Sequence, residues 1–154
     1  MAENFKFRDP GKLVDGDLLL VLVKKSPANP GKGYAPSYQF KMCKAGTGLR
    51  IGRISLRVGS ASKLRYPGHI GYAVHEKHRG HRYAARACRL LLPLAAAHGL
   101  KALWITCNPH NKASVRTLEI VGGKYVETLR VPKTHEMFHR GLMYVRRYRI
   151  ALNK

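Results

Sequence analysis

The N-terminal part of the chain consists of short apolar or alternating segments separated by polar, turn-forming ones. Asp17–Lys25 (DLLLVLVKK) is a run of Leu and Val with the length of a strand. Tyr38–Lys44 and Arg50–Val58 alternate between apolar and polar positions, and the sequence AGTG between them predicts a hairpin with one buried face. Ser26–Ser37 holds three prolines and two glycines, so we predict a loop there. This half of the pattern therefore predicts three antiparallel strands.

The apolar period changes between residues 82 and 98. Apolar residues from Ala84 to Ala95 recur at steps of three and four, while arginines take the other side, which is typical of an amphipathic helix. Gly99 is expected to cap its end. The elements predicted after residue 68 are a strand at His69–Val74, a helix at Arg82–His98, a strand at Leu103–Cys107, a helix at Asn111–Val121, and strands at Lys124–Val131 and Leu142–Leu152.

The order of these elements predicts the fold class. A strand, a helix and a second strand form a βαβ crossover, whose two strands lie parallel. We therefore expect an α/β (α+β) protein with a mixed central sheet and one such crossover. A chain of 154 residues is long enough for one hydrophobic core, so residues 1–154 are expected to form a single domain.

Charge is the unusual feature of the composition. The chain has 29 Lys and Arg against 8 Asp and Glu, a formal net charge of +21. Such a surface attracts polyanions. A phosphorylated cofactor, an acidic substrate and RNA all fit it, and so does a basic surface without a specific partner.

Cysteine usage and the N-terminal segment indicate where the protein works. Cys43, Cys88 and Cys107 are odd in number and show no paired spacing, which argues against a disulfide framework and against a zinc site. No apolar run approaches the roughly 18 residues of a membrane span, and the first residues lack a signal-peptide core. We expect a cytoplasmic protein with neither a bound metal nor a membrane partner.

The stretch HRGHRYAARA, residues 78–87, lies where the predicted crossover turns from strand to helix. Backbone N–H groups at a helix N-terminus are unpaired and bind phosphate well. Small residues that let an anion approach (Gly80, Ala84) and nearby cations (Arg79, His81, Arg82) are both present. The stretch therefore predicts a phosphate site, with a plain basic patch as the alternative.

Two motifs in the right order resemble the GNAT superfamily of acyl-coenzyme A N-acyltransferases. The cofactor motif of that family, Q/R-x-x-G-x-G/A after a strand, is similar to residues 79–84, which follow the strand end Tyr72-Ala73-Val74. Residues 108–114 (NPHNKAS) and 118–123 (LEIVGG) resemble its second motif, N-x-x-S and a helix that ends in a Gly pair. The resemblance covers roughly residues 68–131 and implies a mixed sheet of about six to seven strands.

The resemblance also implies roles for individual residues. The strand at Tyr72, Ala73 and Val74 would pair with the pantetheine arm of acetyl-CoA, and the Val74 N–H would stabilise the oxyanion. Asn111 and Ser114 would approach the coenzyme, with helix capping as the alternative. Backbone amides along the cofactor motif would hold the pyrophosphate; these belong to Arg79, Gly80, His81, Arg82, Tyr83 and Ala84.

The sequence departs from the family pattern at three places. Arg82 replaces a glycine of the cofactor motif, so either the backbone approach is altered or the side chain turns outward. Leu118 stands where many members carry the tyrosine that protonates the departing thiolate. The helices that usually follow the first strand are reduced or absent, so we expect the acceptor pocket to be open, or completed by Lys133–Gly141.

Acid and base candidates come from the remaining titratable residues. His69, on the strand that leads to Val74, is the first candidate for the general base, with a buried or solvent-facing structural histidine as the alternative. Tyr125 is taken as the candidate acid from a set of four possible tyrosines, the others being Tyr72, Tyr144 and Tyr148.

We therefore expect an N-acetyltransferase that moves an acetyl group from acetyl-CoA to a primary amine by direct attack in a ternary complex. The positive charge argues against polycationic acceptors and favours a neutral or acidic small molecule, or a protein amine in an anionic setting such as the ribosome. The alternative is a basic RNA- or ribosome-associated protein that keeps the fold without catalysis. A monomer and a homodimer are both compatible with the sequence.

Overall fold

A single mixed β-sheet organises residues 5–152, the part of the chain that the computed structural model describes. Its eight strands lie in the order β1-β2-β3-β4-β5-β6-β8-β7. The strands are β1 (Leu13–Asp15), β2 (Leu18–Ser26), β3 (Ser37–Lys44), β4 (Arg50–Arg57), β5 (Ile70–Val74), β6 (Ala102–Cys107), β7 (Lys124–Arg130) and β8 (Tyr144–Ala151). The helices are α1 (Tyr83–Ala97), α2 (Lys112–Val121) and α3 (Glu136–His139), with 3-10 turns η1 (Pro30–Lys32) and η2 (Glu76–His78).

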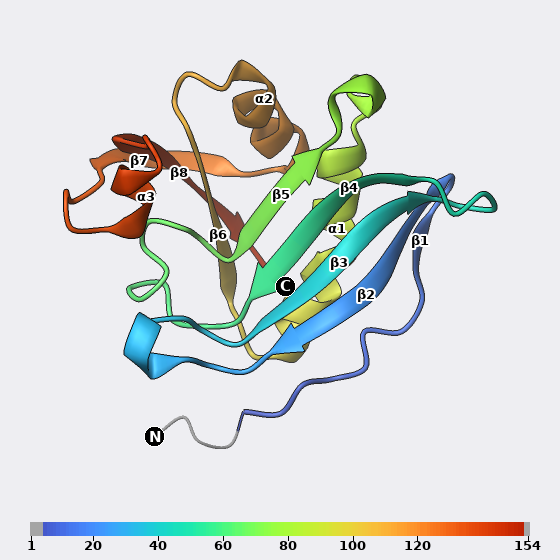
Figure 1. Ribbon diagram of the computed structural model, residues 1–154, viewed down its shortest axis with the longest axis horizontal. Coiled ribbons are helices and arrows are strands. Elements are labelled where there is room, and N and C mark those ends of the chain that lie inside the picture. Colours follow the sequence, from blue (N-terminus) through green and yellow to red (C-terminus); the bar gives the residue numbers. More distant parts are fainter. Residues whose placement is uncertain (1–4, 153–154) are drawn as a thin grey trace.

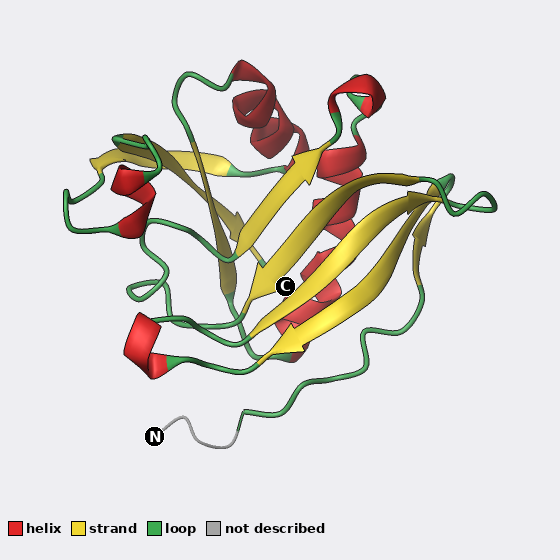
Figure 2. Ribbon diagram, viewed as in Figure 1, coloured by secondary structure: helices red, strands yellow, loops and turns green. Residues whose placement is uncertain are grey.

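Helices α1 and α2 cover one face of this sheet (Figures 1 and 2). The apolar side of α1 is fully buried at Ala87, Cys88 and Leu91, in one core with Phe40 and Ile54 of the sheet. Burial of a side chain the size of Leu contributes about 1.5–3 kcal/mol, so this face fixes the helix on the sheet. The start of α1 is thereby held beside the end of β5.

The elements predicted from the apolar pattern are all present, with boundaries that move by at most two residues. The mixed sheet and its single crossover are confirmed, since β5 and β6 are parallel and the other pairs antiparallel. The sheet has eight strands rather than six to seven, because β1 is an additional strand of three residues paired with β2. An element this short shows no period in the sequence, and the same holds for α3.

The opposite face of β2–β5 is free of α-helices (Figure 2). Residues 27–36 between β2 and β3 contain only the turn η1, which confirms the expectation that the N-terminal helices are reduced. Because Phe40 and Ile54 face the helices, the alternate residues Lys41 and Arg53 face this open side. The open face is therefore polar and basic.

Strands β5 and β6 separate after a short contact between the start of β5 and the second half of β6. They share one registered pair, Ile70 with Ile105, whereas β5 follows β4 over five residues and β6 follows β8 over six. Figure 1 shows the two strands separating toward their C-terminal ends. The parallel pair therefore opens at the C-terminal ends of its strands, next to the N-termini of α1 and α2. Ligands of open parallel sheets bind at this end of the strands.

Candidate active site

The gap between β5 and β6 presents unpaired backbone. The His75 N–H donates to the Ile51 C=O on β4 at 2.8 Å, so His75 faces β4. Backbone groups alternate in direction along an antiparallel pair, so Ala73 also faces β4, whereas Tyr72 and Val74 turn their N–H and C=O groups toward the gap. A ligand lying in the gap can pair with these two residues as a strand would.

The turn after β5 is tied back to this strand. The Arg79 side chain donates from Nε to the Val74 C=O at 3.0 Å. This bond satisfies the Val74 carbonyl and leaves its N–H for a ligand. Arg79 therefore has a positioning role that its place in the motif did not predict.

Arg82 holds a backbone conformation that glycine usually supplies. With φ 61° and ψ 25° it lies in the left-handed region, and it is the one non-glycine residue with positive φ in the described chain. Glycine adopts this conformation without steric cost, which accounts for the glycine expected at this motif position. The Arg82 side chain is exposed, so it turns outward while the backbone keeps the turn.

The first turn of α1 offers backbone donors without a competing carboxylate. No acidic residue lies in this turn, and Gly80 and His81 before it are exposed. The Tyr83 and Ala84 side chains are buried, and the Tyr83 hydroxyl donates to Asp17 of the β1–β2 turn at 2.6 Å. Only the backbone of these two residues is available to an anion.

The second motif forms the start of α2. The Asn111 Oδ1 accepts the Ser114 N–H at 3.0 Å, so Asn111 is the N-cap of the helix and the capping alternative is confirmed for it. Its Nδ2 group takes no part in the cap and can still donate to a ligand. Ser114 is partly buried and lines a cavity described below.

The Tyr72 side chain crosses from β5 toward α2. Its hydroxyl is buried and has no hydrogen-bond partner among the described residues. Burial raises the pKa of this phenol to about 12, while the neighbouring hydroxyls of Ser114 and Thr117 act in the other direction. Tyr72 therefore keeps its proton at neutral pH, and its hydroxyl is enclosed beside α2 with no hydrogen-bond partner among the described residues.

His69 is a structural histidine, which corrects its expected role as the general base. It is 1% exposed. Its Nδ1 accepts the Trp104 N–H at 2.9 Å, so Nε2 carries the proton and donates to the Gly59 C=O at 2.9 Å. Burial also lowers its pKa. With both nitrogens occupied, the ring has no free lone pair for a substrate proton.

Tyr125 lies away from the gap, on β7 at the edge of the sheet. It is 49% exposed, its hydroxyl is bonded to the Thr128 hydroxyl at 2.8 Å, and the Arg146 guanidinium stacks 4.1 Å from its ring centre. Tyr125 does not line the cavity, whereas Tyr72 does. The geometry thus favours Tyr72 over Tyr125 among the four tyrosines.

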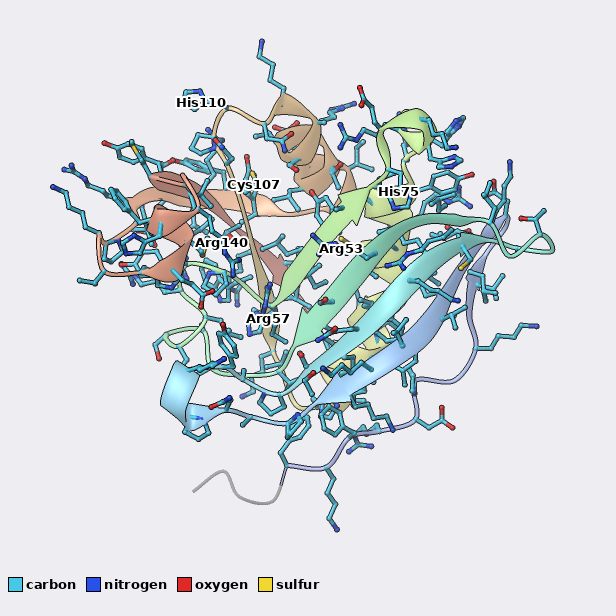
Figure 3. All side chains as sticks on the ribbon, in the orientation of Figure 1. Arg53, Arg57, His75, Cys107, His110 and Arg140 are labelled. Carbon is cyan, nitrogen blue, oxygen red and sulfur yellow. The ribbon has the colours of Figure 1, made fainter. Side chains whose placement is uncertain are left out.

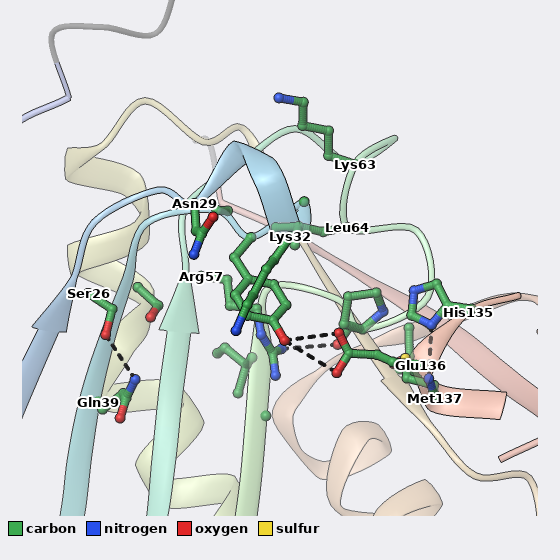
Figure 4. Close-up of a pocket in the computed structure, with 18 of the residues that line it drawn as sticks. Ser26, Asn29, Lys32, Gln39, Arg57, Lys63, Leu64, His135, Glu136 and Met137 are labelled. Atoms are coloured by element: carbon green, nitrogen blue, oxygen red, sulfur yellow. Dashed lines mark hydrogen bonds between the residues drawn. The ribbon is translucent and has the colours of Figure 1, made fainter. Parts of the chain in front are cut away.

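A cavity of about 860 Å³ joins the gap to the helix-free face. At the gap it is lined by Tyr72, Cys107 and Ser114, and at the open face by the β2–β3 loop and by residues 135–142. The Tyr34 hydroxyl donates to Glu136 at 3.1 Å and so links these two segments across the mouth (Figure 4). Part of the segment Lys133–Gly141, namely His135, Glu136, Met137 and Arg140, thus lines this cavity. That the segment completes an acceptor pocket stays a prediction.

Arginine side chains gather at this cavity, and the sequence pattern did not single them out. Arg57 of β4 and Arg140 beside α3 both line it, and Arg53 lies further along β4 (Figure 3). Strand alternation does place Arg53 and Arg57 on the open face, which is a signal available in the sequence. The hydrogen bond between Tyr34 and Glu136 could not be predicted in this way, because 102 residues separate the two in the sequence.

The described residues contain no group of three or more His, Cys, Asp or Glu side chains placed to hold a metal ion. Within the same part of the chain, no helix has the length and apolarity to cross a membrane. Burial raises the pKa of the Cys107 thiol to about 11 and that of Cys88 to about 12, so both are protonated at neutral pH. A thiolate nucleophile is therefore disfavoured at either position.

Comparison with solved structures gives the same architecture. An acetyltransferase of the GNAT family from Bacillus anthracis superposes with a TM-score of 0.60 at 19% identity, over 75% of this chain and 67% of that one. RimL, a ribosomal L7/L12 alpha-N-protein acetyltransferase in complex with coenzyme A, gives 0.59 at 16% identity over 79% of this chain and 64% of its own. The chain thus spans about two-thirds of their length.

A third similar structure matches over almost its full length. The acetyltransferase from Agrobacterium tumefaciens superposes with a TM-score of 0.63 at 21% identity, over 97% of this chain and 99% of that one. No curated protein matches the sequence significantly. At these identities the structural likeness shows the fold.

The sequence itself carries the family signal. Residues 23–124 match the family model described as the acetyltransferase (GNAT) domain. The match runs from the end of β2 into β7 and includes β5, the turn that follows it, α1 and α2. Because it covers more than half of the 154 residues, the chain belongs to the GNAT acetyltransferase domain family.

Proposed function

We propose that this protein transfers an acetyl group from acetyl-CoA to a primary amine that enters from the helix-free face. The observation that carries the proposal is the cavity that joins the gap between β5 and β6 to that face. A coenzyme in the gap and an amine on the open side would meet beside Val74, so both can be bound at once in a ternary complex.

The coenzyme would be held mainly by backbone. Tyr72 and Val74 would pair with the pantetheine arm through groups that β6 leaves unpaired, with Ala73 between them. Amides at the start of α1 would bind the pyrophosphate, assisted by the helix dipole. The RimL complex with coenzyme A supports this assignment by likeness of fold. The phosphate-binding residues are then Arg79, Gly80, His81, Arg82, Tyr83 and Ala84, with Asn111 and Ser114 facing them from α2.

The chemistry would depend on two donors. The amine nitrogen attacks the thioester carbonyl carbon, and the Val74 N–H stabilises the oxygen that becomes negative. The carbon–sulfur bond then breaks, and the Tyr72 O–H donates its proton to the sulfur. The proton lost by the amine passes to solvent through the open cavity. Neither His69 nor Tyr125 has a part in this route.

The open cavity and the proteins of similar structure indicate which classes of amine to consider as the acetyl acceptor. An acceptor site without covering helices can admit the end of a polypeptide as well as a small amine. Among the similar structures, RimL is named as an acetyltransferase of a ribosomal protein. A protein amine in an anionic setting such as the ribosome, or a small neutral or acidic amine, is thus the acceptor to test first, because the chain carries a net charge of +21.

Thermal shift with acetyl-CoA followed by an amine screen tests this function. A ligand that binds the folded state alone must raise the melting temperature, by an amount that grows with its concentration. We expect such a rise, and release of free CoA thiol with some of the amines. No rise at millimolar acetyl-CoA contradicts the proposal, and salt-dependent RNA binding in that case favours the binding-protein alternative.

A further inference from the structure

The cavity contains a guanidinium group with no carboxylate partner. Arg57 is partly buried in the cavity wall, and among residues 5–152 no carboxylate oxygen lies within 4.0 Å of it. Arg140, by comparison, is paired with Glu136 at 2.7 Å. Lys24, Lys32 and Lys63 also line the cavity without an ion pair to a described residue, but these lysines are exposed. Arg57 is therefore the partly buried cation of this cavity that has no carboxylate at close range in the described chain.

One edge of the Arg57 guanidinium is fixed and the other is free. Nη1 donates to the Pro67 C=O at 3.2 Å and to the Gly68 C=O at 3.1 Å. Nε and Nη2 make no hydrogen bond to a described residue, and neither is enclosed by protein. The Nε–Nη2 edge is the one that binds a carboxylate or phosphate through two parallel bonds. Arg57 is thus oriented in advance to receive an oxyanion.

The neighbouring strand is shaped around this side chain. A Cβ atom on Gly71 of β5 would lie 2.9 Å from the Arg57 Nη2. A larger residue at this position would displace the guanidinium. The absence of a side chain at Gly71 lets Arg57 cross β5 and reach the cavity.

Charge in the surroundings increases the attraction for an anion. Five Lys and Arg side chains line the cavity and Glu136 is the one carboxylate among its lining residues. Burial lowers the pKa of Arg57, and the charges of Arg53 and Arg140 lower it further. A cation held among like charges is stabilised when an anion binds to it.

The distance between Arg57 and Val74 determines how far apart the amine and the oxyanion of an acceptor molecule must be. Gly71, which underlies the guanidinium, precedes Val74 by three residues, which corresponds to about 10 Å along an extended strand. The acceptor amine must reach the thioester beside Val74. An oxyanion on the same molecule can then reach Arg57 if it lies roughly 5–10 Å from the amine.

We propose that Arg57 is the anion-binding residue of the acceptor site, and that it selects primary amines carrying a carboxylate or phosphate group at this separation. This inference rests on the proposed acetyl transfer, because it assigns the amine to the thioester position. It goes beyond the general preference expected from net charge, because it places the selection in one side chain and one distance.

Matched pairs of ligands test the assignment by binding as well as by turnover. The carboxylate arm compares 4-aminobutanoate and 6-aminohexanoate with their amides, and the phosphate arm compares O-phosphoethanolamine with ethanolamine. Each ligand is titrated into the protein saturated with CoA, by calorimetry, and then assayed with acetyl-CoA for thiol release. Hydrogen bonds to a charged group imply that the anionic members bind about 10–100-fold more tightly. The arm with the larger ratio identifies the oxyanion.

Variants separate Arg57 from the general positive surface. Arg57→Met is expected to reduce this ratio to about 1, whereas Lys63→Met, at an exposed lysine of the same cavity, leaves it within about twofold. Arg57→Lys keeps the charge but loses the paired donors, so we expect an intermediate ratio. This variant also serves if Arg57→Met does not fold.

The outcomes distinguish the two proposals. Equal or weaker binding of the anionic members, no binding of any member, or an unchanged ratio in both Arg57 variants would each overturn the anion site. Acetyl-CoA that still raises the melting temperature, together with thiol release from neutral amines, would leave the proposed acetyl transfer in place. Failure of acetyl-CoA itself to bind would instead overturn the function on which the site rests.

Discussion

At the scale of single residues, Arg82 is the residue whose backbone conformation conflicts with its side chain. A left-handed conformation costs a non-glycine residue roughly 1–2 kcal/mol. Glycine removes this cost, but it also increases the conformational entropy of the unfolded chain, which offsets part of the gain in stability. We expect Arg82→Gly to raise the free energy of unfolding by about 0.5–1 kcal/mol in urea titrations. We also expect it to weaken CoA binding severalfold at low salt, since a cation beside the α1 N-terminus is lost.

Arg82→Ala is the matched control for this prediction. It removes the same charge but keeps a Cβ, so CoA affinity should fall as in Arg82→Gly while stability does not rise. Tighter CoA binding by Arg82→Gly would show instead that the arginine obstructs the site.

Tyr72 is the second residue whose role is decided by its surroundings. Because its hydroxyl is buried without an acceptor, Tyr72→Phe removes no hydrogen bond within the described chain and should leave stability unchanged or slightly higher. If Tyr72 donates a proton to the departing sulfur, kcat should fall at least about 100-fold while CoA affinity stays within a few fold. Steady-state rates and calorimetry measure the two quantities.

Tyr125→Phe is the comparison for Tyr72→Phe. The Tyr125 hydroxyl is bonded to Thr128 on the outer strand, so its loss should change kcat by less than about twofold. Equal losses in the two variants would contradict the assignment of the acid to Tyr72.

At the scale of elements, the close approach of β4 and β5 depends on a glycine. A Cβ on Gly52 would lie 2.4 Å from the Ala73 C=O oxygen and 3.0 Å from the Val74 Cα, so it would press on backbone that cannot rotate away. We expect Gly52→Ala to destabilise the fold by about 1–3 kcal/mol and to lower kcat by displacing the Val74 N–H. Urea titration and steady-state kinetics report the two effects.

Gly31→Ala supplies a control in a loop of the same cavity face. Its added Cβ would meet only the Asn29 side chain at 3.5 Å, an ordinary contact, and Gly31 does not have a positive φ. Stability and rate should therefore stay close to those of the parent protein. A Gly52→Ala variant that behaves like Gly31→Ala would show that the two strands have more room than the structure gives them.

At the scale of the whole molecule, the buried His69 and the half-buried His98 make stability depend on pH. Burial lowers the pKa of His69 and of His98 from 6.5 in the folded state. Below pH 6.5 the unfolded chain then binds more protons than the folded one. Stability should be complete above this pH and should fall as the pH drops toward the folded-state values.

Urea titrations between pH 5 and 8, in about 1 M salt to screen the net charge, measure this slope. His69→Gln should be less stable than the parent but should show a shallower decline, since it removes one of the protons taken up on unfolding. An unchanged slope in His69→Gln would contradict the buried, neutral state of this histidine.

The sequence by itself determined the longer elements and the family. Periods of two and of three to four residues are local properties, so β2 to β8, α1 and α2 followed from them to within two residues, whereas β1 and α3 are too short to show a period. The motifs at 79–84 and 108–123 identified the turn and the helix starts that would hold a phosphorylated cofactor, because that binding uses backbone whose conformation the local sequence specifies.

Only the tertiary structure decided which side chains share the site. His69 has the residue type of a general base, and it is burial against Trp104 and Gly59 that occupies both of its nitrogens. Arg57 and Glu136 come to one cavity from distant segments, and residue type alone predicts neither the free guanidinium nor its place across Gly71. Backbone geometry is set over a few residues, whereas desolvation and charge balance depend on everything packed around a group, and these are fixed only when the chain has folded.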